Sequence, residues 1–339
     1  MTRPSLAAPT AAVTAALTLL PVAPGVYRMR DGAGRVIYTG RSGDLRARVR
    51  SYWRDLGDRP HLARMLRSVA WVEPTLCASE HEAALFERHL LRRRRPPYNR
   101  TTGVEQLMHL RLVSDAAAPS LDPVVLDAGE EPGGELYGPY LGWEPVRQAA
   151  AALNRLYPLR YTADHLDPSR RELARSRGVG AGDRQPLANR IRAVLERRPR
   201  ALAAARARLT LLRDQAAADL QFEAAAELQR QVDALGWIAQ ARPRPGTAGD
   251  VDVRATSGGA TVVLQVRAGM LHDCLVGPHG SPPAMRVLEP PGDGRPDSND
   301  GHWLATAAAN AALAERLIAA GARPVSPAAG RATGPSRSQ

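Results

Sequence analysis

The chain contains no lysine, because all 46 of its basic residues are arginine. This absence excludes mechanisms that need a lysine amine, such as Schiff-base formation, and phosphate-binding loops that depend on a lysine. Only two cysteines are present, Cys77 and Cys274, too few for a disulfide framework, and two thiols alone do not make a structural zinc site. The cysteine usage therefore predicts a cytoplasmic protein.

Long apolar runs and aromatic side chains are also scarce. No run of 18 apolar residues occurs, so the sequence predicts no membrane-spanning helix and no membrane partner. Aromatic residues make up only 4% of the chain, and we expect cores built mainly from leucine, valine and alanine. A length of 339 residues suggests about two domains.

The arginines give the chain a net charge of +12, which is unevenly distributed. Residues 1–100 carry 18 arginines against 8 acidic residues, and residues 151–200 carry 12 against 5, whereas residues 101–150 carry 2 against 8. Strongly basic proteins most often have a polyanionic partner, so the N-terminal block is the first candidate for contact with nucleic acid. The alternative is an arginine-rich composition whose side chains are merely solvated.

Residue patterns in the first 100 positions predict a small domain of strands and helices. A basic amphipathic helix follows a predicted β-hairpin, and Ser79 with Glu82 matches a capping box at the start of a long helix. The expected helices cover 12–20, Asp44–Tyr52, Leu62–Arg67 and Ser79–Arg94, and the expected strands cover Gly25–Met29, Arg35–Thr39 and Val69–Leu76.

Further along the chain the patterns are mixed. Two adjacent helical patterns predict a helical hairpin, and a polar, arginine- and glycine-rich stretch over 162–186 indicates a linker or a poorly ordered insert. The expected strands are 107–113, 122–127, Asp250–Arg254, Thr261–Arg267 and Met270–Val276, and the expected helices are Val146–Leu156, Ala201–Ala218, Phe222–Ala239 and Trp303–Ala320.

One set of polar and charged side chains in the N-terminal block stands out by its order and spacing. Tyr27 and Tyr38 lie on the two paired strands, Arg48 lies on the basic helix, Glu87 lies in the middle of the long helix, and Asn99 follows it. Taken singly, each has an ordinary interpretation, such as a packing tyrosine or a solvated glutamate. The combination and its order are what single them out.

This ordered set resembles the GIY-YIG nuclease module, in the version found in UvrC and its shorter relative Cho. The resemblance covers about 85 residues. It is carried by Leu20-Pro21, Pro24-Gly25-Val26-Tyr27, Ile37-Tyr38-Thr39-Gly40-Arg41-Ser42-Gly43-Asp44-Leu45-Arg46-Ala47-Arg48-Val49, Glu82-Ala83, Leu85-Phe86-Glu87 and Pro97-Tyr98-Asn99.

The resemblance implies an α/β (α+β) fold, with a small antiparallel sheet and flanking helices, followed by a helical hairpin and a small C-terminal α+β segment. It implies a DNA endonuclease that makes a single incision, on the 3′ side of a lesion in damaged double-stranded DNA, in nucleotide excision repair with a UvrB-like partner. Two alternatives remain: a catalytically inactive adaptor that binds DNA and UvrB, or a stand-alone structure-specific nuclease.

The resemblance also implies roles for the five side chains. Glu87 would hold one Mg²⁺ or Mn²⁺, which accept a single carboxylate plus waters and phosphate oxygens, and Arg48 would pair with the scissile phosphate. Tyr38 or Tyr27 would orient or deprotonate the attacking water; we favour Tyr38. A tyrosine pKa near 10 is high for a base, so we expect nearby cations to assist. Asn99 would shape the site.

Basic and aromatic neighbours of these residues are the expected DNA contacts. Two positions depart from the family pattern, because Thr39 replaces an aliphatic residue and Arg41 replaces the usual lysine. For the run Arg92–Arg95 the alternative is a solvated helix end stabilised by the helix dipole. The expected contacts are Arg41, Arg46, Arg50, Tyr52, Arg92 and Arg93.

Two downstream stretches extend the resemblance. Leu136-Tyr137-Gly138-Pro139-Tyr140 is similar to the segment after the nuclease module of UvrC, but no cysteine occurs between 78 and 273, which excludes the iron–sulfur cluster that comes next in that family. Ala216–Leu228 resembles the UVR motif that pairs UvrC with UvrB. Its apolar residues Phe222, Ala225 and Leu228 would form a partner-binding stripe, unless they pack within the chain.

The expected organisation therefore has six parts. They are a GIY-YIG nuclease domain over 12–103, a connecting segment over 104–161, a polar linker over 162–200, a UVR-like hairpin over 201–240, a small C-terminal domain over 250–320 and a disordered tail over 321–339.

Overall fold

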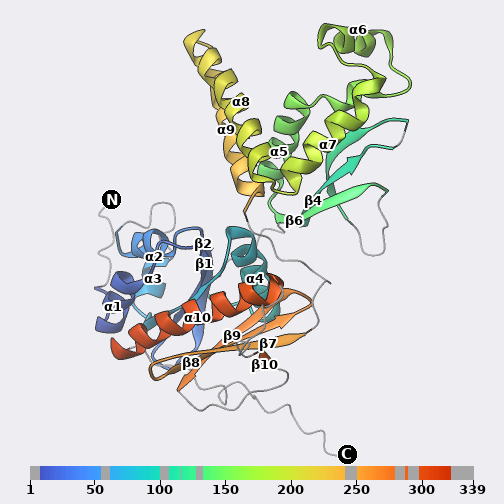
Figure 1. Cartoon of the computed structure of the whole chain (residues 1–339). Coiled ribbons are helices and arrows are strands. Elements are labelled where there is room, and N and C mark those ends of the chain that lie inside the picture. The colour runs from blue at the N-terminus through green and yellow to red at the C-terminus, as the bar shows by residue number, and fades with distance from the viewer. Residues whose placement is uncertain are drawn as a thin grey trace, which may run out of the picture. The chain divides into compact units, whose positions relative to one another are not determined.

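The computed structural model describes residues 8–54, 62–99, 107–115, 117–126, 133–240, 250–278, 287–288 and 298–321. The chain divides into two compact units, one made of Met1–Thr102 with Pro243–Gln339 and the other of Gly103–Arg242 (Figure 1). Both units combine helices with small antiparallel sheets, which confirms the predicted mixed fold class. Within the described parts of the chain, no helix has the length and apolar character needed to cross a membrane.

The first unit is built around a three-stranded sheet in the order β2-β1-β3, all antiparallel, where β1 is Gly25–Arg30, β2 is Val36–Ser42 and β3 is Trp71–Leu76. The central strand β1 is buried along its whole length. Alternate residues of a strand point to opposite faces, so Tyr27 enters one hydrophobic cluster and Val26 enters another. Both faces of this small sheet are therefore covered.

Four helices contribute to the cluster on the Tyr27 face: α1 (Ala11–Leu19), α2 (Leu45–Arg54), α3 (Leu62–Leu66) and α10 (Ser298–Ala319). Helix α4 (Glu80–Arg93) contributes to the cluster on the Val26 face. As the sequence predicts, Ser79 caps α4, with its Oγ accepting a hydrogen bond from the Glu82 N–H at 3.2 Å. The Glu82 carboxylate in turn accepts one from the Ala78 N–H. These caps fix where α4 begins, and so which of its side chains face the sheet.

The C-terminal residues form a second sheet in the order β10-β7-β8-β9, covered by α10 (Ser298–Ala319). The strands are β7 (Val251–Ser257), β8 (Ala260–Arg267), β9 (Met270–Pro278) and β10 (Val287–Leu288). We expected a separate small domain over 250–320. Instead Leu264 and Trp303 share one core with Val26 and Phe86 of the N-terminal block, so this segment belongs to the first unit.

Polar contacts join the two parts of this unit as well. Asn310 of α10 pairs with the backbone of Leu76 in β3, accepting from its N–H at 2.8 Å and donating to its carbonyl at 3.1 Å. Arg28 of β1 donates to Glu73 of β3 at 2.6 Å and to the carbonyl of Cys274 in β9 at 3.1 Å. Neither contact leaves a local signal in the sequence, which is why the sequence predicted two domains here.

The second unit contains the sheet β5-β4-β6, with β4 at Leu107–Val113, β5 at Ser120–Val125 and β6 at Glu135–Leu141. Helix α5 (Trp143–Leu156) packs on this sheet and against the hairpin of α8 (Pro199–Ala218) and α9 (Phe222–Ile238). This hairpin matches the predicted one closely.

The stretch 162–200 differs from the expected linker. It folds as α6 (Pro168–Ser176) and α7 (Arg184–Leu195), with short 3₁₀ turns at Leu159–Thr162 and Ala181–Asp183. Helix α7 buries Leu187, Ile191 and Leu195 in the main core of this unit. The arginines between these apolar residues, Arg190 and Arg192, made the apolar stripe difficult to recognise in the sequence. The predicted tail over 321–339 lies, apart from Gly321, outside the described residues.

Candidate active site

Three tyrosine side chains contact one another in the core of the first unit. Tyr27 of β1 and Tyr52 of α2 are fully buried, and their hydroxyl oxygens lie 2.7 Å apart. The Tyr52 hydroxyl also donates to the Tyr38 hydroxyl of β2 at 3.2 Å. The three rings contact one another with centroids 5.9–6.3 Å apart.

Glycine makes this arrangement possible. Tyr27 and Gly40 are direct partners across the β1–β2 ladder, and a Cβ atom at Gly40 would lie 2.4 Å from the Tyr27 hydroxyl oxygen. A Cβ atom at Gly25 would likewise lie 2.4 Å from the carbonyl oxygen of Thr75. The glycines of both sequence triplets are thus required by close packing, and the second one makes room for a tyrosine of the first.

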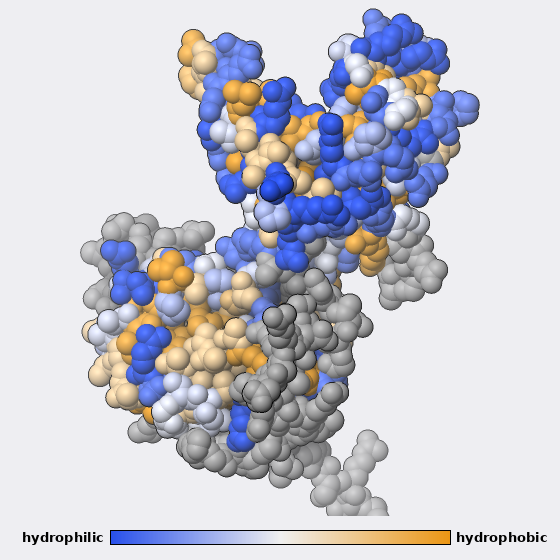
Figure 2. Space-filling view, in the orientation of Figure 1, coloured by the Kyte–Doolittle hydropathy of each residue, from blue (hydrophilic) through white to orange (hydrophobic). Residues whose placement is uncertain are grey.

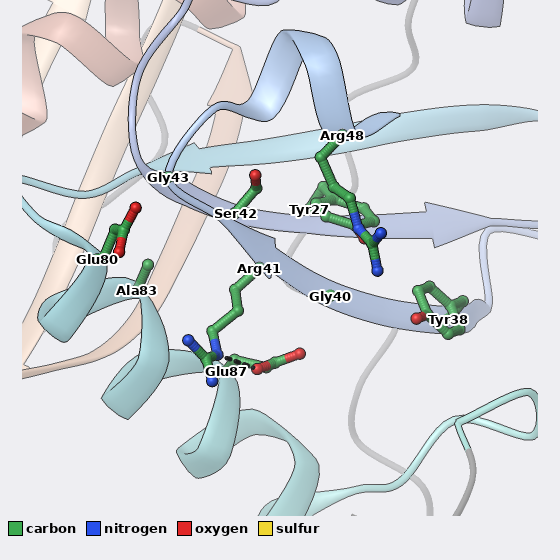
Figure 3. Close-up of a pocket in the computed structure, with 10 residues that line it drawn as sticks. All are labelled: Tyr27, Tyr38, Gly40, Arg41, Ser42, Gly43, Arg48, Glu80, Ala83 and Glu87. Atoms are coloured by element: carbon green, nitrogen blue, oxygen red, sulfur yellow. Dashed lines mark hydrogen bonds and ion pairs between the residues drawn. The ribbon is translucent and has the colours of Figure 1, made fainter. Parts of the chain in front are cut away.

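A polar cavity of about 350 Å³ opens beside the tyrosines (Figure 3). Strands β1 and β2, the loop after β2, and helices α2 and α4 all contribute to its wall. The lining residues are Tyr27, Tyr38, Gly40, Arg41, Ser42, Gly43, Arg48, Glu80, Ala83 and Glu87. Four of the five predicted catalytic residues therefore converge on one cavity.

Charged side chains dominate the wall of this cavity. Arg41 Nε lies 2.9 Å from Glu87 Oε2, and the two side chains retain 31% and 19% of their exposure. The Arg48 guanidinium lies over the ring of Tyr52, 5.4 Å from its centroid. The cavity thus brings two guanidinium groups and a carboxylate close to the tyrosine hydroxyls.

The environment of the tyrosines opposes their ionisation. Burial, followed by the neighbouring hydroxyls, raises the pKa of Tyr27 well above its ordinary value. Burial and the hydrogen bond with Tyr52 likewise raise the pKa of Tyr38, and Arg48 offsets only part of this. The expected help from nearby cations is therefore outweighed in this structure.

Asn99, the fifth predicted residue, does not line the cavity. Its side chain pairs with the backbone of Thr39 in β2, accepting from the N–H at 2.9 Å and donating to the carbonyl at 2.7 Å. This pairing supplies hydrogen-bond partners for the backbone N–H and carbonyl of Thr39, which lie on the edge of β2 that does not pair with β1. It thereby fixes the strand that carries Tyr38 and Arg41. The position agrees with the expectation that Asn99 shapes the site.

The residues predicted to contact DNA are dispersed. Arg46 donates to the carbonyl of Leu20 at 2.6 Å, and Arg50 donates to the carbonyl of Leu17 at 2.8 Å, both at the end of α1. Arg92 and Arg93 are exposed near the end of α4. The prediction for Tyr52 is wrong, because a fully buried ring cannot stack on a base.

Sequence reasoning missed a second carboxylate. Glu80 lines the same cavity, and its Oε1 packs so closely on Gly43 that a Cβ atom there would lie 1.8 Å away. The sequence spacing could have indicated this, because residues seven positions apart, about two helical turns, lie on the same face of a helix. Across the described parts of the chain, no three His, Cys, Asp or Glu side chains gather as a metal site.

The predicted partner-binding stripe is only partly available. Ala225 and Leu228 are buried in the core of the second unit, with 9% and 6% exposure, so the prediction for these two is wrong. Phe222, at the start of α9, is 67% exposed. Figure 2 shows apolar surface at the far end of the α8–α9 hairpin, where Phe222 and Leu220 lie.

Comparison with known proteins shows which family the N-terminal block resembles. Residues 23–100 match the family model of the UvrC-like GIY-YIG domain. The chain is 32% identical to UvrABC system protein C of Ectopseudomonas mendocina (strain ymp) and 33% identical to that of Pseudomonas fluorescens (strain SBW25), each over 261 residues, covering 73% of this chain and 42% of the relative. The chain thus spans less than half the length of these relatives.

A solved structure is also similar over the N-terminal block. It is the GIY-YIG N-terminal endonuclease domain of UvrC from Thermotoga maritima, described as bound to its catalytic divalent cation, magnesium. The sequence identity is 29%, the match covers 25% of this chain and 92% of that domain, and the TM-score is 0.23. The family match and the relatives confirm the resemblance, and residues 23–100 are therefore a UvrC-like GIY-YIG domain in a chain similar to UvrABC system protein C.

Proposed function

We propose that this protein is a DNA endonuclease that depends on a divalent cation. The observation that carries the proposal is the convergence of Tyr27, Tyr38, Arg48 and Glu87 on one polar cavity of a UvrC-like GIY-YIG domain. Phosphodiester hydrolysis needs a positioned water, a cation for the phosphate and stabilisation of the leaving group. A site that had lost catalysis would be expected to have lost at least one of these four side chains.

Glu87 is the proposed metal-binding residue, and its surroundings fit that role. Its carboxylate lines the cavity, and a second carboxylate, Glu80, lines the same cavity about two helical turns away on α4. Mg²⁺ prefers oxygen ligands and keeps several waters, so one protein carboxylate and an open polar cavity suit it, and Mn²⁺ takes the same donors. When bound, such a cation neutralises phosphate charge and makes a bound water more acidic.

The chain's own residues would bind and orient the substrate. Arg48, at the cavity wall, would hold the scissile phosphate, which its planar guanidinium matches in geometry. Tyr38 lies nearer the solvent than the fully buried Tyr27, so its hydroxyl is the better candidate to orient the attacking water. Burial and the Tyr52 hydroxyl raise the pKa of Tyr38 further above neutrality, so its protonated hydroxyl is suited to orienting a water by hydrogen bonding.

The relatives extend this proposal to DNA repair. We propose a single incision in damaged double-stranded DNA, on the 3′ side of the lesion, in concert with a UvrB-type partner. The support is the similarity to UvrABC system protein C over 73% of the chain, together with the helical hairpin α8–α9, whose sequence resembles the UVR motif. The absence of cysteine between 78 and 273 supports action without an iron–sulfur cluster.

The test is incision of a lesion-bearing duplex by the full chain, with and without UvrB, in Mg²⁺ or Mn²⁺, with both strands labelled to map the cut. Glu87→Gln preserves size but removes the anionic ligand, and we expect a loss of roughly 10³-fold in cleavage. DNA binding should be nearly unchanged. Asp122→Asn, an exposed carboxylate in the second unit, is the matched control.

Three outcomes decide between the possibilities. Cleavage that requires UvrB supports the repair role, and cleavage of branched or damaged DNA without UvrB indicates a stand-alone structure-specific nuclease. Tight binding without cleavage by the unaltered chain indicates an adaptor. Near-normal cleavage by Glu87→Gln would overturn the assignment of Glu87.

A further inference from the structure

The ion pair between Arg41 and Glu87 occupies the carboxylate that we propose as the metal ligand. Arg41 follows Gly40 on β2, and its Nε lies 2.9 Å from Glu87 Oε2 inside the cavity (Figure 3). Neither side chain is fully exposed, with 31% and 19% of side-chain exposure remaining. The pair is therefore screened less by water and salt than an ordinary surface ion pair.

A guanidinium and a divalent cation compete for this carboxylate. Arginine stays protonated at every pH at which proteins fold, so it cannot leave as a neutral group. A cation bound to Glu87 would repel the guanidinium at short range in a partly desolvated cavity. The Arg41 guanidinium on Glu87 therefore disfavours cation binding at this carboxylate.

A DNA phosphate offers Arg41 an alternative partner. The guanidinium fork matches a phosphate as well as a carboxylate, and it can form two parallel hydrogen bonds with either. Arg41 lies on the same cavity wall as Arg48, which we propose as the ligand of the scissile phosphate. Among the described strands, β2 is an edge strand that pairs only with β1, and Figure 3 shows the long Arg41 side chain extending from it to Glu87 of α4.

We propose that Arg41 is a positioning residue that couples cation binding to DNA binding. Without DNA, its guanidinium holds the Glu87 carboxylate and weakens cation binding. With DNA, the guanidinium moves to a backbone phosphate and frees the carboxylate for the cation. This inference rests on the proposed function, because it assumes that Glu87 is the cation ligand.

The affinities for the cation and for DNA are thermodynamically coupled, so the proposal can be tested by measuring either one. If DNA tightens cation binding through Arg41, the cation must tighten DNA binding by the same factor. An ion pair of intermediate exposure contributes modestly, so we expect Arg41→Gln to tighten Mn²⁺ binding by about 3- to 10-fold in DNA-free protein. General structural damage would weaken cation binding, so a tightening separates this role from a purely structural one.

The experiment measures Mn²⁺ binding to the full chain by electron paramagnetic resonance of the free ion. All proteins carry Tyr38→Phe, so that added duplex stays intact, and gels verify this. Arg41→Gln is compared with Arg35→Gln, which removes the same charge from an exposed guanidinium that pairs with the largely buried Asp31 on the β1–β2 turn. Arg41→Met, which keeps side-chain length, provides a second variant in case Arg41→Gln does not fold.

We expect DNA to tighten Mn²⁺ binding in the parent protein and in Arg35→Gln, and to do so much less in Arg41→Gln and Arg41→Met. Equal Mn²⁺ affinity of the parent and both Arg41 variants without DNA, with Glu87→Gln abolishing binding, would overturn the coupling and leave the metal assignment intact. Mn²⁺ binding that Glu87→Gln does not weaken would overturn the metal assignment and the coupling together.

Discussion

At Tyr38 the protein surrounds a phenol with groups that favour its neutral form. Burial and the Tyr52 hydroxyl raise the pKa of Tyr38, and burial and the neighbouring hydroxyls likewise raise that of Tyr27. In the unfolded chain both phenols titrate near pH 10. A raised folded-state pKa contributes stability that is complete below about pH 10 and is lost as pH rises towards the folded value.

We therefore expect the free energy of unfolding to fall as pH rises above about 10. Urea denaturation at neutral pH and at increasing alkaline pH measures this fall. Tyr27→Phe removes one of the two phenols, so its stability should decline less steeply than that of the parent protein over the same range. An identical decline in both proteins would show that Tyr27 titrates normally in the folded state.

Gly40 is a position in the site where close packing leaves no room for a methyl group. A Cβ atom there would meet the Tyr27 hydroxyl oxygen at 2.4 Å and its Cζ at 2.6 Å, and the ring is fully buried and cannot swing away. We expect Gly40→Ala to cost about 1–3 kcal/mol of stability, as overpacking usually does. It should also displace Tyr27 and lower cleavage.

Gly32→Ala provides the comparison, because a Cβ atom at Gly32 has nothing within 4 Å. Thermal and urea denaturation of the two variants test the prediction. Equal stability of the two would mean that the β1–β2 pair shifts without cost to accept the methyl group.

The residue scale also shows how far the sequence could predict the site. The order of the motifs predicts that Tyr27, Tyr38, Arg48 and Glu87 share a site, and they line one cavity. The pattern Leu45, Val49, Tyr52 at helical spacing would have indicated that Tyr52 is buried. No sequence pattern reports the Arg41–Glu87 pair, because it depends on the distance between β2 and α4.

At the scale of elements, α4 depends on support from a distant part of the chain. The end of β3, which leads into α4, is held by Asn310 of α10, whose amide pairs with both backbone groups of Leu76. Asn310 is 4% exposed, so water cannot readily replace it. Removal of the amide leaves the partly buried N–H and carbonyl of Leu76 without this partner.

We expect Asn310→Ala to cost about 1–3 kcal/mol, the usual penalty for buried polar groups that lose their hydrogen bonds. Urea denaturation of the full chain measures it. Arg316→Ala, on the same helix but exposed, should remain within about 0.5 kcal/mol of the parent protein. A loss confined to Arg316→Ala would contradict the role of Asn310.

Element prediction succeeded where local signals were strong. Ser79 and Glu82 predicted the start of α4, and the helical hairpin was predicted within two residues at each end. Prediction failed at α7, where Arg190 and Arg192 interrupt the apolar stripe in the sequence. In the structure Arg192 pairs with Glu135 of β6 at 2.6 Å, a contact between residues far apart in the chain.

At the scale of the whole molecule, sequence order and domain order differ. The proposed site lies entirely in the first unit, which joins the first 102 residues to the C-terminal segment. The second unit interrupts it and carries the UVR-like hairpin. Catalysis and partner binding are thus assigned to different units, so variants of the hairpin can be tested without disturbing the cavity.

The hairpin separates the two roles that its apolar residues can play. Phe222 is 67% exposed at the tip, whereas Leu228, two turns further along α9, is 6% exposed in the core of the unit. We expect Phe222→Ala to leave the unfolding free energy nearly unchanged and to weaken a UvrB-type partner by about 1–3 kcal/mol, the range for an aromatic anchor. Leu228→Ala should cost about 2–5 kcal/mol of stability.

Calorimetric titration with purified UvrB and urea denaturation of the same proteins measure the two effects. Cleavage without the partner should be the same for Phe222→Ala and the unaltered chain, because the hairpin and the cavity belong to different units. If Phe222→Ala binds UvrB as well as the parent protein does, the exposed tip is not the docking surface. The buried residues of α9 could not replace it, since their side chains already pack within the second unit.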